Sequence, residues 1–90
     1  MKRIKILING MVTGVFFRKF ICDHATSLGL SGYVRNTEDG GVEAVFEGDE
    51  DKINKMIEIC KKGPKYSQIK NMQIKPETFQ GFKDFKVLHI

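Results

Sequence analysis

The spacing of apolar residues changes along the first third of the chain. Ile4, Ile6 and Ile8 recur at every second position, which predicts a strand over residues 2–9 with one well-buried face. Beyond this strand the apolar period lengthens to that of a helix. The inward face of the predicted helix comprises Phe17, Phe20, Ile21, Ala25 and Leu28. Gly29 is expected to end it, because glycine accepts the left-handed conformation common at helix ends.

The middle of the chain shows the pattern of a β-hairpin. A strand is predicted over residues 30–36, and alternating Val42, Ala44 and Phe46 predict the next one. The segment Asp39-Gly40-Gly41 between them has the composition of a tight turn. The two strands are therefore expected to pair with each other.

A second helix and two further strands complete the pattern. Asp49 is a favourable N-cap residue, and Gly63-Pro64 ends the helix that follows. The inward face of this helix comprises Ile53, Met56, Ile57 and Cys60. A fourth strand is predicted over residues 69–76, and Phe85 and Val87 indicate a short strand near the C-terminus.

The order of these elements predicts an α+β fold of the ferredoxin-like kind. A β-α-β-β-α-β succession with a short C-terminal edge strand is the split β-α-β sandwich, with two helices on one face of an antiparallel sheet. Right-handed crossovers place the first and third strands at the centre, with the second beyond the third. The first and second strands then end at the same edge of the sheet. The loop over residues 10–18 and Asn36 are therefore expected to lie close together.

Composition and charge limit the classes of function. The 90 residues suffice for a single small domain over 1–90, and 41% hydrophobic and 29% charged residues are typical of a globular protein. Cys22 and Cys60 form no C-x-x-C pair and are expected to be free thiols. No apolar run is long enough to cross a membrane. We expect a cytoplasmic protein, and its small size favours a monomer. The net charge of +4 favours anionic partners without identifying one.

The segment GMVTGVFFR, residues 10–18, has the features of an anion-binding loop. Backbone N–H groups of a glycine-containing turn can surround an anion, and the start of the following helix adds further N–H groups. Arg18 falls in that first turn, and its planar guanidinium can bind two phosphate oxygens at once. The segment lacks the Gly-Lys-Ser/Thr of a P-loop. On spacing alone, a structural turn remains the commoner interpretation of Gly10 and Gly14, as it does for Asn36.

The same residues resemble the signature of the acylphosphatase family, G-x-V-x-G-V-x-F-R. The similarity extends without gaps over nearly the whole chain. Its matching positions are Gly10, Val12, Gly14, Val15, Phe17, Arg18, Ala25, Leu28, Gly29, Leu30, Gly32, Val34, Asn36, Asp39, Gly40, Val42, Glu43, Gly48, Gly63, Pro64 and the closing Phe85–Val87. With so many fixed spacings, the resemblance makes phosphate binding the strongly favoured interpretation.

The resemblance implies metal-free hydrolysis of a small acyl phosphate to a carboxylate and inorganic phosphate, with no cofactor. Arg18 corresponds to the arginine that binds the phosphoryl group, and Asn36 to the asparagine that orients the attacking water. The substrate-binding segment comprises Thr13, Gly14, Val15, Phe16 and Phe17. The chain departs from the family at Thr13, where glutamine is usual, and at Ser67, where alanine is common. Because the loop acts mainly through main-chain N–H groups, Thr13 is expected to affect fine tuning more than activity.

Three other classes of function fit the sequence less well. A cysteine phosphatase needs C-x₅-R, which neither Cys22 nor Cys60 provides. Metal binding needs clustered ligands, whereas His24 and His89 are far apart in the chain. The alternative of another class is a non-catalytic anion-binding or RNA-binding ferredoxin-like domain. RNA binding usually needs aromatic residues on the central strands, and the third strand offers only Phe46 on its apolar phase. No nucleic acid or membrane partner is therefore expected.

Overall fold

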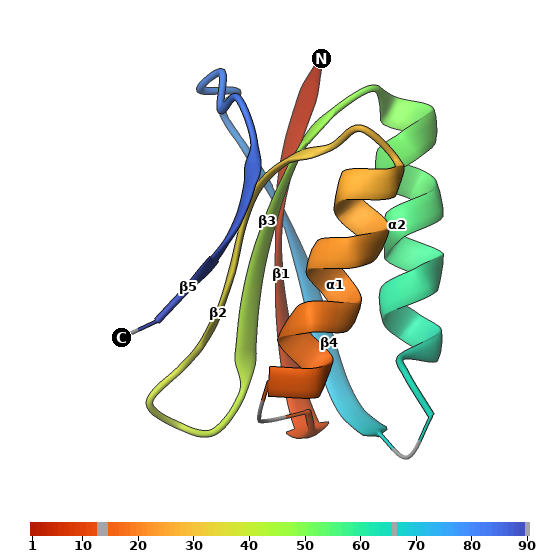
Figure 1. The fold of residues 1–90 in the computed structure, drawn as a ribbon, viewed down its shortest axis with the longest axis vertical. Helices are drawn as coiled ribbons and strands as arrows, with labels where there is room; N and C mark the ends of the chain where they lie inside the picture. Colours follow the sequence, from red (N-terminus) through yellow and green to blue (C-terminus); the bar gives the residue numbers. More distant parts are fainter. Residues whose placement is uncertain (13–14, 66, 90) are drawn as a thin grey trace.

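The computed structural model describes residues 1–12, 15–65 and 67–89, and it has two helices on one face of a five-stranded sheet (Figure 1). The elements in chain order are β1 Lys2–Met11, α1 Val15–Ser27, β2 Ser31–Asn36, β3 Val42–Gly48, α2 Glu50–Lys62, β4 Gln68–Glu77 and β5 Phe85–Leu88. This succession confirms the predicted ferredoxin-like arrangement. Most predicted boundaries lie within two residues of the observed ones.

The strand order in the sheet is β4-β1-β3-β2-β5. As predicted, β1 and β3 are central and β2 lies beyond β3. The four predicted main strands pair with one another in antiparallel directions, whereas the short edge strand β5, whose direction was not predicted, pairs with β2 in parallel, with Gly32 opposite Phe85 and Arg35 opposite Leu88. The chain reverses after β4 and crosses to the far edge of the sheet before β5 begins (Figure 1). Since β2 already runs antiparallel to β4, a reversed strand beside β2 must run parallel to it.

The hydrophobic core lies between the sheet and the two helices, where the apolar periods placed it. Phe17, Ile21 and Ala25 are the buried residues of α1. Those of α2 are Ile53, Met56 and Cys60. The strands contribute the buried residues Ile6, Ile8, Val34, Val42, Ala44 and Phe46. The core therefore fixes the position of both helices over the sheet.

A β-bulge near the start of β4 changes which side chains face the core. Ile8 pairs with Met72 and Gly10 pairs with Ile69, and the register shifts between Asn9 and Gly10. Ile69 and Met72 consequently both pack against the core although they are three residues apart. Gly10, which the sequence placed in the anion loop, lies within β1 at this bulge. Its φ is +138°, and an added Cβ would lie 2.1 Å from the carbonyl oxygen of Gln68.

On the face opposite the helices, a buried carboxylate holds the connection between β4 and β5. Glu47 of β3 is 2% exposed. Its carboxylate accepts hydrogen bonds from the backbone N–H groups of Gln80 and Phe82, each at 2.6 Å. Arg3 donates to the same carboxylate at 3.1 Å, and its guanidinium lies 4.9 Å from the centre of the Phe82 ring. These contacts hold the connection against the sheet. The connection leads to β5, which lies at the edge of the sheet beside β2.

We predict that Glu47→Gln lowers the free energy of unfolding by about 1–3 kcal/mol at neutral pH, because buried N–H groups lose an ionised acceptor. Burial opposes ionisation of Glu47, but the two amides and Arg3 outweigh it and lower its pKa from the ordinary 4.5. The stabilisation is therefore present above that pH and is lost as the pH falls through the folded-state value. In urea unfolding between pH 7 and pH 3, the free energy of unfolding should decrease less for Glu47→Gln than for the wild type.

The control for this measurement is Glu58→Gln, which removes an exposed carboxylate that lies 3.2 Å from Lys61. A surface pair of this kind contributes less than about 1 kcal/mol. Equal losses in the two variants would contradict the role of Glu47.

We predict that Gly10→Ala costs at least about 3 kcal/mol of unfolding free energy, because the new Cβ meets backbone atoms of β4 and the φ is unfavourable. Gly40→Ala is the matched control. Gly40 has a φ of +86° and nothing within 4 Å of an added Cβ, so this substitution should cost only about 1–2 kcal/mol. Denaturant unfolding measures both, and similar losses would show that the bulge tolerates a side chain.

Candidate functional site

The two predicted catalytic residues lie at the same end of the sheet. Arg18 is in the first turn of α1, and Asn36 is the last residue of β2. The β1 strand and the β2 strand both end there, and α1 begins beside them (Figure 1). The structure therefore places Arg18 and Asn36 at the edge that the topology predicted.

The side chain of Asn36 lies on the face of the sheet that carries the helices. Gly32 and Val34, at alternate positions of β2, are buried on that face, and Asn36 continues the alternation. Among the described residues, its Oδ1 is the buried side-chain oxygen that has no hydrogen-bond partner. An unpaired buried carbonyl oxygen is costly unless a ligand or water uses it. Asn36 therefore presents an acceptor at the end of the sheet.

The side chain of Arg18 reaches the segment that follows β5. Its Nη1 lies 3.2 Å from Nδ1 of His89, and the guanidinium must be the donor because it has no acceptor atom. In the parallel ladder the last pair is Arg35 with Leu88, and His89 follows directly after it. The segment after β5 thus contacts the side chain of Arg18.

His89 is a site residue that the sequence did not reveal. From the sequence, His89 was of interest only as a metal ligand, and it is far along the chain from the other candidate ligands. The available signal was its alternation with Phe85 and Val87, which places all three on the helix side of the sheet. The alternation alone could not place His89 near Arg18, because the strand that pairs with β5 was not known from the sequence.

The predicted substrate-binding residues divide into two groups. Thr13 and Gly14 lie outside the described residues. Val15, Phe16 and Phe17 open α1, where the first backbone N–H groups of a helix have no partner within it. The Phe17 side chain is 2% exposed and belongs to the core, whereas that of Phe16 is 82% exposed. Any contribution of Phe17 to anion binding therefore comes from its backbone.

A cavity of about 220 Å³ lies between α1 and the C-terminal end of β5. The residues that line it are Val15, Arg18, Lys19, Cys22, Asp23, Val87 and His89. Lys19 donates to Asp23 at 3.0 Å, and both side chains are largely exposed. The Lys19 ammonium and the Asp23 carboxylate therefore pair with each other at the surface of the cavity.

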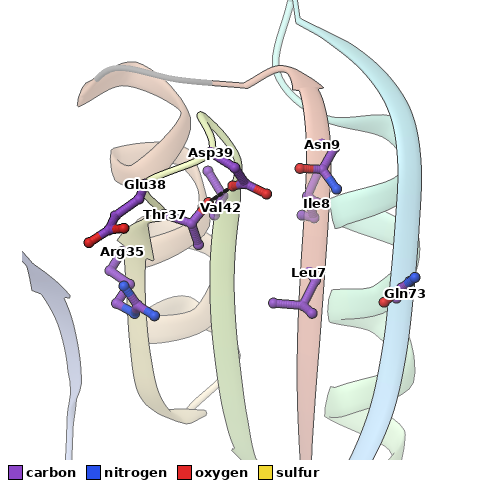
Figure 2. Close-up of a pocket in the computed structure, with 9 residues that line it drawn as sticks. All are labelled: Leu7, Ile8, Asn9, Arg35, Thr37, Glu38, Asp39, Val42 and Gln73. Carbon is purple, nitrogen blue, oxygen red and sulfur yellow. Dashed lines mark hydrogen bonds between the residues drawn. The ribbon is translucent and has the colours of Figure 1, made fainter.

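A larger cavity of about 530 Å³ lies on the opposite face of the sheet, beside the hairpin that joins β2 and β3 (Figure 2). Three of its polar lining residues, Arg35, Thr37 and Asp39, make side-chain hydrogen bonds. Arg35 donates to Glu43 at 3.0 Å, and the hydroxyl of Thr37 donates to Asp39. The Thr37 hydroxyl and the Gly41 amide hold the pKa of Asp39 below its ordinary value. This cavity is on the far side of the sheet from α1, so its size does not make it the site of Arg18.

Neither cysteine chemistry nor metal binding finds support in the described residues. Burial raises the pKa of the Cys60 thiol to about 12, so this thiol is not a nucleophile near neutral pH. Within residues 1–12, 15–65 and 67–89, no group of three or more His, Cys, Asp or Glu side chains is placed to hold a metal ion. Neither α1 nor α2 has the length and apolar character needed to cross a membrane.

Comparisons with known proteins agree on one family. The family model described as Acylphosphatase matches residues 4–87. A protein of Caldivirga maquilingensis named acylphosphatase is 44% identical over 84 residues, covering 92% of this chain and 86% of that protein. One of Syntrophobacter fumaroxidans is 45% identical over 80 residues, covering 89% and 82%. The crystal structure of acylphosphatase from Bacillus subtilis superposes with a TM-score of 0.94 at 30% identity, covering 99% of this chain and 100% of that one.

Proposed function

Since the chain belongs to the acylphosphatase family and is a hydrolase, we propose that it cleaves the carboxyl-phosphate bond of small acyl phosphates. The products are a carboxylate and inorganic phosphate. The observation that best supports this proposal is that Arg18, in the first turn of α1, and the buried, unpaired Oδ1 of Asn36, at the end of β2, lie at the same end of the sheet (Figure 1). A cation and a free acceptor are the two groups that such a reaction needs from side chains.

Arg18 binds the phosphoryl group in this proposal, together with backbone N–H groups of residues 13–17. The guanidinium offers donors in a fixed plane that matches two phosphate oxygens. The N-terminal end of α1 adds the positive end of its dipole. His89 supports the position of the guanidinium through its hydrogen bond at 3.2 Å.

Asn36 orients the attacking water. Its Oδ1 is buried and unpaired among the described residues, so it can accept a hydrogen bond from a water molecule. The amide is neutral, which makes it an orienting group rather than a base. Orientation alone is valuable when a water must attack phosphorus in line with the departing oxygen.

The reaction requires neither a general acid nor a metal in this proposal. The carboxylate leaving group is stable at neutral pH, so its oxygen needs no proton in the transition state. Phosphoryl transfer passes through a loose transition state and depends mainly on positioning and charge stabilisation. The phosphoryl group itself can accept the proton of the water. We also propose that the protein acts as a cytoplasmic monomer without a cofactor.

The alternative of a non-catalytic RNA-binding domain finds little support on the sheet face that such domains use. The described side chains of the central strands on that face are charged, aliphatic or, in one case, a neutral amide. They are Arg3, Lys5, Leu7 and Asn9 of β1 and Glu43, Val45 and Glu47 of β3. Stacking of bases needs aromatic side chains at such positions. The connection between β4 and β5 also occupies part of this face through Glu47.

We predict that Arg18→Ala lowers kcat/KM for acetyl phosphate at least about 10³-fold and weakens inhibition by inorganic phosphate, because one preorganised charged donor is lost. Steady-state kinetics with a chelator present measure both effects. Lys55→Ala is the control, since it removes an exposed positive charge from α2 far from Arg18. Wild-type activity in Arg18→Ala would overturn the proposed function.

We predict that Asn36→Ala lowers kcat about 10²–10³-fold and leaves the inhibition constant of inorganic phosphate within about threefold of the wild type. The reason is that Asn36 contacts the water and Arg18 holds the phosphate. Asn54→Ala, on the exposed surface of α2, serves as the control. A parallel loss of turnover and phosphate affinity would show that Asn36 binds the phosphoryl group instead.

A further inference from the structure

We propose that the cavity between α1 and β5 receives the hydrocarbon part of the substrate. The preferred substrates are then phosphates of short, apolar carboxylic acids rather than acyl phosphates with charged or strongly polar acyl groups. This inference rests on the proposed function, because it assumes that Arg18 holds the phosphoryl group. It adds the identity of the acyl group, which the phosphate-binding residues do not specify.

The cavity is adjacent to the phosphoryl group because Arg18 lines it. The hydrogen bond between Arg18 and His89 spans 3.2 Å, and both of these side chains belong to the cavity wall. A phosphoryl group on the guanidinium therefore lies at the mouth of the cavity. The acyl carbon is one bridging oxygen away from phosphorus, so the chain attached to it can enter.

Three of the residues that line the cavity are apolar. Val15 and Cys22 come from α1 and Val87 from β5. Val87 also packs against the hydrophobic core, and a cysteine thiol behaves as a small hydrophobic group. The two valine side chains and the thiol favour binding of an alkyl chain over binding of a polar group, which would lose its hydration.

The charged residues at the rim do not provide a site for a charged acyl group. Lys19 and Asp23 pair with each other at 3.0 Å, with side-chain exposures of 72% and 61%. Exposed groups of this kind interact weakly with a ligand because water screens them. Arg18 is engaged by the phosphoryl group when substrate is bound. Selection among acyl groups therefore falls to the apolar walls.

The volume of the cavity limits the length of the acyl group. At about 220 Å³ it is smaller than the roughly 300–1,000 Å³ that is typical of drug-sized ligands. It suits an acyl group of a few carbon atoms, or one aromatic ring. The larger cavity in Figure 2 is no alternative, because it lies on the far side of the sheet and Arg18 does not line it.

The test compares acetyl, propionyl and butyryl phosphate. Their carboxylate leaving groups have nearly the same basicity, so their intrinsic reactivity is nearly constant and chain length is the variable. For the wild type we expect kcat/KM to rise up to about fourfold with each methylene group, the ratio expected for burying one methylene. Equal kcat/KM values for the three substrates, or a decrease with length, would overturn the inference.

Variants on two walls identify the cavity as the cause of this rise. Val87→Thr keeps the shape of the side chain and introduces a hydroxyl group, so the increase per methylene should fall to less than about twofold. Leu88→Thr is the matched control, because the neighbouring side chain lies on the other face of the sheet and does not line this cavity. Cys22→Ser tests the α1 wall independently of β5. An unchanged chain-length dependence in both wall variants would overturn the inference.

The same data separate this inference from the proposed function. Absence of turnover of all three substrates by the wild type would refute the proposed function itself. Turnover of all three with equal kcat/KM would leave the proposed function intact and refute only the acyl cavity. Circular dichroism of each variant establishes that it is folded before its kinetics are compared.

Discussion

A carboxylate buried on the face of the sheet opposite the helices holds the connection between β4 and β5. Glu47 is ionised in a position with almost no solvent, and it remains so because two backbone amides and Arg3 supply the hydrogen bonds that water would otherwise provide. Those amides belong to the connection that brings β5 alongside β2. The residues that β5 and the segment after it contribute, Val87 and His89, face α1 on the other side. The contacts of Glu47 thus hold the connection that leads to β5, and the pairing of β5 with β2 then places Val87 and His89 beside α1.

The sequence predicted the parts of the fold that depend on local periodicity. The two helices, the central position of β1 and β3, and the common edge of β1 and β2 follow from apolar spacing and from the handedness of crossovers. These features are redundant, since many residues carry the same information. The family resemblance added the specific pair of Arg18 and Asn36, and the structure places both at the predicted edge.

The features that were missed depend on contacts between distant residues. A strand of four residues such as β5 carries no signal for its partner, so its parallel pairing was not foreseen. The role of His89 depends on that pairing and was missed with it. Glu47 lies in an alternating strand where a polar residue predicts solvent, and only the partners Arg3, Gln80 and Phe82 explain its burial. The bulge opposite Gly10 could not be predicted either, because it is a property of the pairing between β1 and β4, which are distant in the chain.

The residues of the proposed site belong to elements that are anchored to different degrees. The guanidinium and the first amides of α1 belong to a helix anchored in the core by Phe17 and Ile21, and Asn36 belongs to β2, which is paired on both sides. The remaining wall comes from β5, an edge strand whose only neighbour in the sheet is β2. Substitutions in β5 can alter that wall without disturbing the anchored elements. Related chains could thus differ in the shape of this cavity through changes in a short surface strand, while Arg18 and Asn36 keep their positions on anchored elements.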